Sequence, residues 1–537
     1  MMAPAELELP PIDFTQPLSL ARQLARAVAL APERTALVSR NARLSFAELD
    51  ALASRAAGAL AGLGVGAGDR VAVCLPNGPE IVTALFGCWK LGAVFTGVHR
   101  VLAAPEKRFM LEDSGARILL ADPENARQVG AIQDGIESLE RIVTVAEAAA
   151  EDEWRGLLAQ SSPEPPQRDV DPLACAAIAY TSGTTGRPKG VMHSQHNSLL
   201  LGAAALTRGN FGPQDTDLAV HALTILNLLV IHPLCSIQTL AKLVISDRHD
   251  AAGLARWIRD EQVVHISVVP TVLHELLTSR EVTDSDLASL RKPRTGGAGM
   301  SEAAKLRFEE RFGSRPVTSF SLTEAPNQVC RQDTGDPTPE GSCGRPLPHI
   351  EVKILDEAGR EVPTGEVGEI CFGPMHEGPW AGVYRTMLGY WGRPEESAET
   401  LREGRVRSGD MGRFDASGEL FIVDRKKELI IRGGSNIYPA EIERVLLADA
   451  RIAECVVAPL PDEKYGELIV ACVQLSEGCR ATAEELRALC AGQLASYKVP
   501  SEIRFVDAFP RSPLGKIARS QVKENVRATP LSGARRA

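Results

Sequence analysis

A ten-residue run rich in glycine and hydroxyl side chains is the stretch of this chain best suited to chemistry. It reads Thr181-Ser182-Gly183-Thr184-Thr185-Gly186-Arg187-Pro188-Lys189-Gly190 and follows an apolar run, residues 174–180, that predicts a strand. Glycines let backbone N–H groups point inward, hydroxyls add donors, and Lys189 supplies a cation. The run therefore predicts a loop that binds a polyphosphate. A solvated turn is the structural alternative, and the length and order of the run disfavour it.

Four further motifs follow this loop in order. They are Phe320-Ser321-Leu322-Thr323-Glu324, then Arg407-Ser408-Gly409-Asp410, then Asp424-Arg425-Lys426-Lys427-Glu428 running on into Gly433-Gly434-Ser435-Asn436-Ile437-Tyr438-Pro439-Ala440-Glu441-Ile442-Glu443, and finally Pro510-Arg511-Ser512-Pro513-Leu514-Gly515-Lys516. The series resembles the signatures of the adenylate-forming superfamily, which includes acyl-CoA synthetases, luciferases and the adenylation domains of peptide synthetases. The loop spacing differs from the common G-x-x-x-x-G-K-[ST] pattern, so that nucleotide loop is not the match. The resemblance covers nearly the whole chain.

The resemblance implies an ATP-dependent acid–thiol ligase. Such an enzyme joins a carboxylate to ATP, giving acyl-AMP and pyrophosphate, and then passes the acyl group to coenzyme A, giving acyl-CoA and AMP. The expected small molecules are ATP, Mg²⁺, coenzyme A and a carboxylic acid. Joining two anions requires cations near the reacting phosphate.

The resemblance also implies roles for single residues. Lys516 matches the family's catalytic lysine, although without the motif a solvated surface lysine would be the better interpretation. Glu324 would bind Mg²⁺, because hard cations prefer carboxylate oxygens. Thr323 would contact a phosphate oxygen, and Lys189 completes the expected catalytic set. The predicted ATP- and AMP-binding residues are Thr181, Ser182, Gly183, Thr184, Thr185, Gly186, Lys189, Gly297, Ala298, Thr318, Ser319, Phe320, Thr323, Asp410, Arg425 and Lys516.

Three of these residues carry expectations about the nucleoside. Asp410 would accept hydrogen bonds from both ribose hydroxyls, since a carboxylate is an acceptor-only group that suits a diol. Arg425 would also reach the ribose, and Phe320 would stack on adenine. The alternatives are a turn aspartate for Asp410 and an exposed ion pair for Arg425.

The sequence departs from the family pattern at two places. Thr318 stands where many relatives have Asn or Asp, and Ser321 replaces a glycine, so the adenine contacts differ from the usual set. Residues 222–227 stand where many relatives read Pro-Leu-x-His, and the histidine that often lines the acyl pocket is missing. The predicted acyl-pocket residues are Leu226, Asn227 and Leu228. This aliphatic wall favours a hydrophobic or bulky acid, although a plain buried helix has the same composition.

Two half-reactions at one site require movement. Lys427 matches the family's hinge position, where a few backbone dihedral angles absorb a domain rotation. Gly434 would then line the tunnel for the thiol arm, where a side chain would block passage. These matches predict an N-terminal AMP-binding domain over 1–426 and a small, mobile C-terminal domain over 427–537.

The elements that must position these residues read as α/β. Ser45 and Glu48 form a capping box before a helix that ends near Gly64. Alternating strands and helices follow and predict layered, mostly parallel sheets. From about residue 341 short strands broken by Gly and Pro predict a β-rich lobe, and the chain beyond 424 predicts a compact α+β domain. The expected elements are strands at 71–75, 117–121, 142–145, 351–355, 368–372, 455–458 and 469–475, and helices at 79–91, 439–447 and after Thr482.

Composition excludes several other classes. The chain has 537 residues and a net charge of -10, with no basic patch for nucleic acid. Its 11 cysteines form no C-x-x-C pair, which indicates a reducing compartment, and the N-terminus lacks the pattern of a secretory signal. A cytoplasmic protein is expected. Residues 218–241 carry no Asp, Glu, Lys or Arg, but their histidines and proline favour a buried core segment over a membrane span. A homodimer is possible.

Three alternatives stay open at the level of sequence. A stand-alone enzyme of this kind could load a carrier protein instead of coenzyme A, and a luciferase-type oxidation is a further option. A non-catalytic nucleotide-binding homologue would keep the same fold. The last is disfavoured because the phosphate-loop lysine, the acidic residues and the C-terminal lysine are all retained.

Overall fold

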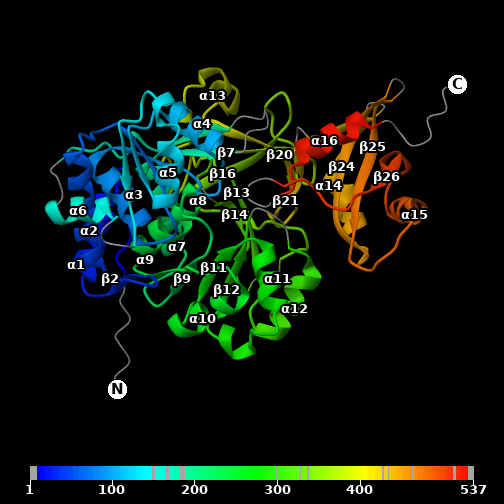
Figure 1. The fold of residues 1–537 in the computed structure, drawn as a ribbon. Coiled ribbons are helices and arrows are strands. Elements are labelled where there is room, and N and C mark those ends of the chain that lie inside the picture. The colour runs from blue at the N-terminus through cyan, green and yellow to red at the C-terminus, as the bar shows by residue number, and fades with distance from the viewer. Residues whose placement is uncertain are drawn as a thin grey trace. The chain divides into compact units, whose positions relative to one another are not determined.

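The chain divides into two compact units, each formed by two segments. The computed structural model describes residues 9–147, 151–164, 168–181, 188–296, 300–326, 328–335, 338–425, 428–432, 435–462, 465–511 and 516–529. The first unit comprises Met1–Val352 and Cys371–Ser408, and the second comprises Lys353–Ile370 and Gly409–Ala537. Figure 1 labels the elements of both units.

A nine-stranded sheet of the first unit has a parallel centre and antiparallel edges. Helices α10 (Ala251–Glu261), α11 (Pro270–Thr278) and α12 (Glu302–Phe312) lie beside it in Figure 1 and share a buried core with its strands. In spatial order the strands are β15 (Arg345–Pro346), β14 (Gln328–Arg331), β13 (Val317–Ser321), β12 (Lys292–Thr295), β11 (His265–Val268), β9 (Thr216–Ala219), β10 (Lys242–Ile245), β1 (Thr35–Val38) and β2 (Arg43–Ser45).

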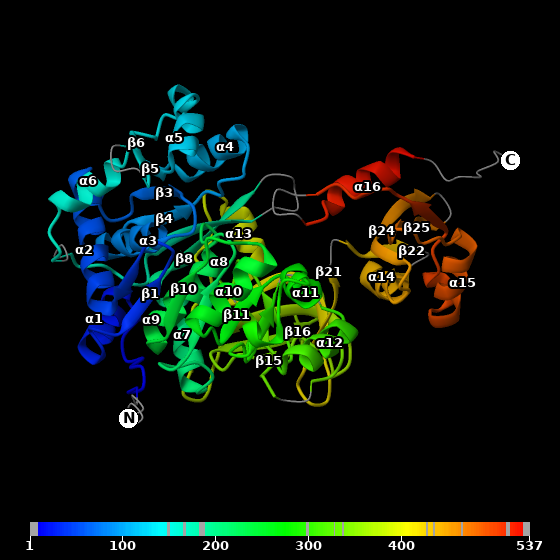
Figure 2. The same cartoon turned by 60° about the horizontal axis from the view of Figure 1, so that its bottom comes forward.

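A seven-stranded sheet of the same unit contains the strand predicted at 174–180, which is the first strand of a hairpin. Its order is β18 (Gly389–Tyr390), β8 (Lys189–Ser194), β7 (Cys175–Thr181), β4 (Val94–Gly97), β3 (Arg70–Cys74), β5 (Ile118–Ala121) and β6 (Arg141–Thr144). The helices in this part of the chain are α2 (Phe46–Gly62), α3 (Pro79–Leu91), α4 (Ala104–Ser114), α5 (Pro123–Gly130) and α6 (Glu153–Gln160). Helix α3 contacts β3 and β4, and Figure 2 shows it beside them. The Ser45–Glu48 capping box is present at the start of α2, as predicted.

A buried helical layer packs within the first unit. Helix α7 (Gln195–Thr207) contacts a segment formed by α8 (Leu226–Leu229), the π-helix η2 (Val230–Leu234) and α9 (Cys235–Thr239). Pro233 lies inside the π-helical turn, where its missing N–H cannot complete a regular helical hydrogen bond. The segment is largely buried, as the core interpretation of 218–241 expected. Within the part of the chain that the structure describes, no helix is long and apolar enough to cross a bilayer. Helix α1 (Leu20–Leu30) also contacts α9.

A five-stranded sheet forms the predicted β-rich region. Its strands are β16 (Ile350–Leu355), β17 (Gly368–Pro374), β20 (Arg405–Phe414), β19 (Leu401–Arg402) and β21 (Leu420–Arg425), and α13 (Pro394–Thr400) precedes β19. The strands predicted at 351–355 and 368–372 are therefore present.

The C-terminal part of the second unit is the predicted α+β fold. Its sheet contains β23 (Ser435–Ile437), β22 (Ile430–Arg432), β25 (Gly466–Leu475), β24 (Ile452–Asp462) and β26 (Glu502–Phe505). Helices α14 (Pro439–Leu447) and α15 (Ala483–Gln493) pack on one face, and α16 (Arg519–Ala528) packs on the other. Figures 1 and 2 show α15 and α16 on opposite sides of β24 and β25. This arrangement explains why alternate residues of both long strands enter different cores.

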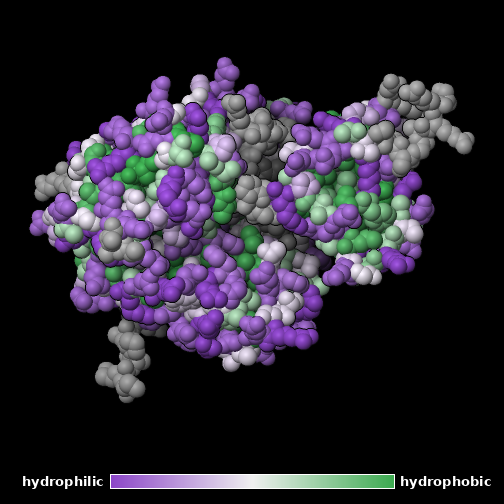
Figure 3. Space-filling model, in the orientation of Figure 1, coloured by the Kyte–Doolittle hydropathy of each residue, from purple (hydrophilic) through white to green (hydrophobic). Residues whose placement is uncertain are grey.

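The predicted fold class is thus confirmed: mixed sheets with parallel centres and a separate C-terminal α+β fold. The predicted hinge and domain boundary at Lys427 lie outside the described residues and stay predictions. On the face drawn in Figure 3, hydrophilic side chains are interspersed with smaller hydrophobic areas.

Candidate active site

The two ends of the predicted phosphate loop lie opposite each other. Thr181 at the end of β7 pairs in register with Lys189 at the start of β8, and Tyr180 pairs with Gly190. The antiparallel pairing brings the two ends of the predicted loop together. The predicted residues between these ends are Ser182, Gly183, Thr184, Thr185 and Gly186. These five predicted residues lie outside the described part of the chain.

Asp113, at the end of α4, fixes the base of this hairpin. Its Oδ2 accepts a hydrogen bond from the Tyr180 hydroxyl at 2.7 Å, and its Oδ1 lies 3.3 Å from the Arg393 guanidinium. Trp391 adds two contacts, from its indole Nε1–H to the Asp113 carbonyl at 2.9 Å and from its backbone N–H to the Gly190 carbonyl at 2.7 Å. The hairpin, α4 and the segment after β18 are therefore held together.

Lys189 is the cation at this hairpin. Its Nζ lies 5.0 Å from the ring centroid of Tyr390, within the range of a cation–π contact, and it forms an ion pair with Glu396 of α13. The Lys189 side chain is 17% exposed. The ammonium group is thus held in a partly buried setting, where its charge is less screened than on an open surface.

Tyr390 links this cation to the predicted magnesium ligand. Its hydroxyl donates to Oε1 of Glu324 at 2.9 Å. Burial, together with the charge of Glu324, raises the pKa of Tyr390, so the phenol stays protonated and remains a donor. Lys189, Tyr390 and Glu324 therefore form one connected group, named here the Lys189–Glu324 junction.

His193 holds the neighbouring residue, Thr323. Its Nε2 lies 2.7 Å from the Thr323 carbonyl oxygen, and because a carbonyl only accepts, Nε2 carries the proton. Burial lowers the pKa of His193 to about 4, so the ring is neutral at neutral pH. His193 follows Lys189 by four residues on β8 and so points to the same face of the sheet. One strand thus positions both the cation and the Thr323–Glu324 turn.

The predicted adenine residues lie on β13, directly before that turn. Thr318, Ser319 and Phe320 are all buried. The Thr318 N–H donates to Oε1 of Gln332 at 2.8 Å. Gln332 follows β14, so this bond ties β13 to its antiparallel neighbour. Gly297 and Ala298 lie outside the described residues.

The predicted acyl wall forms helix α8. Leu226 is buried, whereas Asn227 and Leu228 are half-buried. The turn before α8 packs against Gly97, where an added Cβ would lie 1.7 Å from the Thr224 carbonyl oxygen, so only glycine fits there. The contacts of Lys189 with Tyr390 and Glu396, and of Tyr390 with Glu324, connect described residues other than those of α8. The predicted acyl wall therefore does not belong to the Lys189–Glu324 junction.

The remaining predicted residues belong to the second unit. Asp410 is buried on β20 and pairs in register with Arg425 of β21. Gly409, just before it, has φ of 71°, a left-handed conformation that favours glycine. Lys516 is exposed and lies beside the bridge between Arg511 and Ile517. Lys427 and Gly434 lie outside the described residues.

The donor set of the junction fits Mg²⁺ and a polyphosphate. Glu324 offers the carboxylate oxygen that a hard cation prefers, and the Tyr390 bond fixes its orientation. Lys189 offers a positive charge at the mouth of a glycine-rich hairpin.

Sequence reasoning missed Asp113, His193, Tyr390 and Glu396. A signal existed for Tyr390 and Glu396, because Gly389-Tyr390-Trp391-Gly392 places two aromatic residues between glycines, just before the Pro-Glu-Glu start of α13. His193 could have been found from strand periodicity, since it shares a face with Lys189. Asp113 gives no local signal.

Comparison with known proteins identifies the family. The model of the AMP-binding enzyme family matches residues 24–391, and that of the AMP-binding enzyme C-terminal domain matches residues 441–516. A feruloyl-CoA synthase from Amycolatopsis sp is 34% identical over 93% of this chain and 97% of the relative. A fatty acid–[acyl-carrier-protein] ligase from Streptomyces coeruleorubidus is 33% identical over 92% and 93%, respectively.

A solved structure agrees with these relatives. The o-succinylbenzoate coenzyme A synthetase from Bacillus subtilis, in complex with ATP and a magnesium ion, superposes with a TM-score of 0.80 at 29% identity, covering 95% of this chain and 99% of that one. The predicted superfamily and enzyme class are confirmed. The chain belongs to the AMP-binding enzymes and is an AMP-forming acid–thiol ligase, of a class whose members use ATP, Mg²⁺ and coenzyme A.

Proposed function

We propose that this protein is an ATP-dependent acyl-CoA ligase that activates a hydrophobic or bulky carboxylic acid. In the first step a carboxylate oxygen attacks the α-phosphorus of ATP, the bond from that phosphorus to the β-phosphate oxygen breaks, and pyrophosphate leaves. In the second step the thiolate sulfur of coenzyme A attacks the acyl carbon, the bond from carbon to the AMP oxygen breaks, and AMP leaves. The thiol proton goes to solvent.

The Lys189–Glu324 junction is the observation that carries this proposal. It joins a lysine at the base of a glycine-rich hairpin to a carboxylate on a separate turn, through one tyrosine. A polyphosphate needs a cation and a metal-binding carboxylate within one site. Glu324 would hold Mg²⁺, which neutralises phosphate charge, and Lys189 would exchange its Glu396 partner for phosphate oxygens. Thr323, held by His193, would donate its hydroxyl to a phosphate oxygen.

The other predicted residues have assigned roles in the same proposal. Asp410 and Arg425 bind the ribose, Phe320 stacks on adenine beside Thr318, Ser319 and the Gly297–Ala298 segment, and Lys516 neutralises charge at the α-phosphate. Lys427 acts as the hinge between domains at 1–426 and 427–537, and Gly434 lines the thiol tunnel. The register pairing of Asp410 with Arg425 supports a shared task for these two residues.

The acid class rests on helix α8. Helix α8 contains the buried Leu226 and the half-buried Asn227 and Leu228, and this mostly aliphatic composition supports an apolar acid over acetate. The relatives that act on ferulate and on fatty acids both use acids with large apolar parts. A homodimer and a cytoplasmic location remain predictions from the sequence.

Two of the relatives differ in the acceptor thiol, since one is named for coenzyme A and the other for an acyl-carrier protein. We assign coenzyme A here because the relatives named for coenzyme A include the feruloyl-CoA synthase, which is 34% identical over 93% of this chain. A screen of acids of graded size tests both choices. It is run once with coenzyme A and once with a carrier protein that bears its thiol-ended prosthetic arm. Thioester formed only on the carrier would overturn the assignment of coenzyme A.

The Lys516→Ala variant tests the catalytic assignment. Adenylation should fall by at least about 100-fold, because a charge-bearing donor near the developing charge is lost. Thioester formation from ready-made acyl-adenylate should persist. The control is Arg527→Ala, which removes another exposed cation of the same unit, and it should keep both half-reactions. Equal loss of both half-reactions in Lys516→Ala would remove that lysine from its role.

A further inference from the structure

A second polar cluster lies inside the first unit, around a small cavity. The cavity has a volume of about 10 Å³, the space of about one water-sized sphere. Apolar side chains from α7 and η2 line one side, including Leu201 and Ile231. His265 of β11, Arg294 of β12 and Arg331 of β14 line the other side. Two arginines in the wall of so small a cavity are unusual, because a guanidinium group is seldom buried beside apolar side chains.

Both arginines are deeply buried and poorly partnered. Arg294 is 7% exposed and Arg331 is 3% exposed. The Nε atoms of both have no hydrogen-bond partner among the residues that the structure describes. The carboxylate nearest to Arg331 is that of Asp333, at 3.5 Å, and Asp333 also pairs with Arg208. Buried guanidinium groups normally have charged partners of their own. Arg331 instead shares its carboxylate partner, Asp333, with Arg208.

Among the described residues of this region, the fully buried aspartate Asp217 serves other groups. Oδ2 of Asp217 lies 2.7 Å from Nδ1 of His232, and Oδ1 lies 2.5 Å from Nδ1 of His265. The described cluster therefore sets three guanidinium groups, those of Arg208, Arg294 and Arg331, against the two carboxylates of Asp217 and Asp333. One positive charge is in excess.

The excess charge cannot be removed by simple deprotonation at neutral pH. Burial, reinforced by the like charge of Arg331, lowers the pKa of Arg294 to about 9, which still leaves the group charged at pH 7. Burial, reinforced by the charge of Arg294, lowers the pKa of His265 to about 4, so that ring is neutral and adds no charge. A buried charge without a partner is costly, and a bound counter-ion would compensate it.

We propose that this cavity is a binding site for one small monovalent anion of halide size, held between Arg294 and Arg331. The two guanidinium groups supply N–H donors, and the anion compensates the excess charge. The volume excludes sulfate, phosphate and carboxylates, which need several times the space of one water. A water molecule is the competing occupant. It would satisfy Nε2 of His265, which has no partner among the described residues, but would leave the charge uncompensated.

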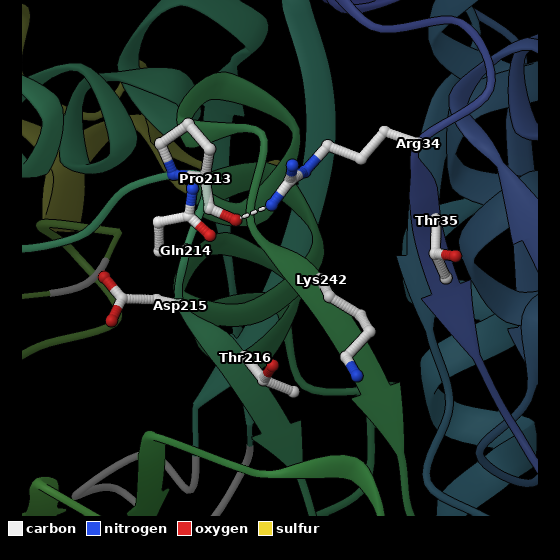
Figure 4. Close-up of a pocket in the computed structure, with 7 residues that line it drawn as sticks. All are labelled: Arg34, Thr35, Pro213, Gln214, Asp215, Thr216 and Lys242. Atoms are coloured by element: carbon white, nitrogen blue, oxygen red, sulfur yellow. Dashed lines mark hydrogen bonds between the residues drawn. The ribbon is translucent and has the colours of Figure 1, made fainter. Parts of the chain in front are cut away.

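A larger cavity of about 260 Å³ shows the contrast. It lies at the amino ends of β1, β9 and β10, and Arg34 and Lys242 line it. Figure 4 shows Arg34 directed at the Pro213 carbonyl, with which it forms a hydrogen bond. Lys242 binds Glu261 at 2.9 Å. Arg34 and Lys242 are only half-buried and already have hydrogen-bonding partners, so solvent screens their charges and that cavity does not require an anion.

The site has a structural consequence. The arginines come from β12 and β14, whereas Ile231 and Cys235 come from the helical segment that begins with α8. An anion in the cavity would therefore stabilise the packing of the nine-stranded sheet against the layer that carries the predicted acyl wall. A ligand bound only by the folded state raises stability by mass action.

Bromide provides the direct test. Crystals of the full-length protein, grown without chloride and soaked in sodium bromide, should give an anomalous difference peak between the guanidinium groups of Arg294 and Arg331. A water molecule there, with no anomalous signal at high bromide, would overturn the proposal.

Thermal unfolding tests the same site in solution. At constant ionic strength, replacing gluconate with chloride should raise the unfolding temperature of the full chain by a few degrees and then saturate. The rise should disappear in Arg294→Met and persist in Arg307→Met, which removes an exposed arginine of the same unit. An equal rise in both variants would mean that chloride acts on the surface and not in the cavity. Should Arg294→Met fail to fold, the bromide map of the unaltered protein decides the question.

Discussion

Tyr390 has two contacts that a single substitution can separate. The Tyr390→Phe variant keeps the ring over Lys189 but removes the hydroxyl that donates to Glu324. A hydrogen bond to a charged group contributes about 1.5–3 kcal/mol, so adenylation should fall by roughly 10- to 100-fold. Because Glu324 loses its orienting partner, the Mg²⁺ concentration at half-maximal rate should rise. Pyrophosphate exchange measured over a range of Mg²⁺ concentrations checks both effects.

Tyr180 supplies a matched control, because it is a second tyrosine whose hydroxyl donates to a carboxylate. The acceptor is the carboxylate of Asp113, at 2.7 Å, and the Tyr180 side chain is half-buried. Tyr180→Phe should leave the Mg²⁺ dependence unchanged, since it does not touch Glu324. If both variants shifted the Mg²⁺ requirement equally, Tyr390 would be acting through the fold and not through the metal ligand.

The hairpin of β7 and β8 is the element on which the phosphate site depends. Asp113→Ala should leave the Tyr180 hydroxyl and the Arg393 guanidinium without their shared carboxylate. Unfolding should become easier by about 1–3 kcal/mol, and the Michaelis constant for ATP should rise, because the base of the loop loosens. Chemical denaturation and ATP titration measure the two quantities.

A neighbouring glutamate provides the control for that element. Glu112 pairs with Arg108 on the exposed side of α4, an i,i+4 pair that contributes only about 0.3–0.5 kcal/mol. Glu112→Ala should therefore leave ATP binding unchanged. A normal Michaelis constant in Asp113→Ala would show that the hairpin base does not position the nucleotide.

Local elements were predictable from sequence, and the contacts between them were not. The helix at Pro79–Leu91 begins with a proline and ends before Gly92 in a left-handed conformation, both of which are short-range signals. The capping box of Thr482 and Glu485 before α15 is likewise local. Tyr390, by contrast, lies 66 residues from Glu324, and His193 lies 130 residues from Thr323. Such pairs depend on the spatial order of the strands within each sheet. Local sequence patterns do not specify that order.

The same limit applies to the site residues. Lys189 was predicted from the composition of the glycine-rich loop. Thr323 and Glu324 were identified only through resemblance to a known motif series, because a Thr-Glu pair also occurs in many proteins that bind no nucleotide. The structure links them through residues outside those motifs, Tyr390 and His193. The buried arginines of the second cluster sit on strands that read as ordinary β-sheet, so no pattern marked them.

Buried histidines in several parts of the first unit predict that acid destabilises the folded protein. Burial lowers the pKa of His193 and of His221 to about 4, and that of His349 to about 3. An unfolded histidine titrates near 6.5, so between about pH 6.5 and 4 the unfolded chain binds more protons. The stability of the folded state is fully present above pH 6.5 and is lost as the pH falls through that window.

Urea unfolding at pH 7.5, 6 and 5 checks this prediction. Each buried histidine should lower the unfolding free energy by about 1.4 kcal/mol per pH unit inside the window. An unfolding free energy that stays constant or rises on acidification would show that these rings protonate without cost in the folded protein.

The transfer of an oxygen atom from the acid to AMP distinguishes activation through an acyl-adenylate from other routes to the thioester. A carboxylic acid accepted in the size screen, labelled with ¹⁸O in both carboxylate oxygens, is incubated with ATP, Mg²⁺, coenzyme A and the protein, and the nucleotide products are analysed by mass spectrometry. Because a carboxylate oxygen attacks the α-phosphorus and stays with AMP when the thioester forms, one ¹⁸O atom should appear in AMP and none in pyrophosphate. Formation of ADP, or of ¹⁸O-labelled phosphate with unlabelled AMP, would contradict activation through an acyl-adenylate.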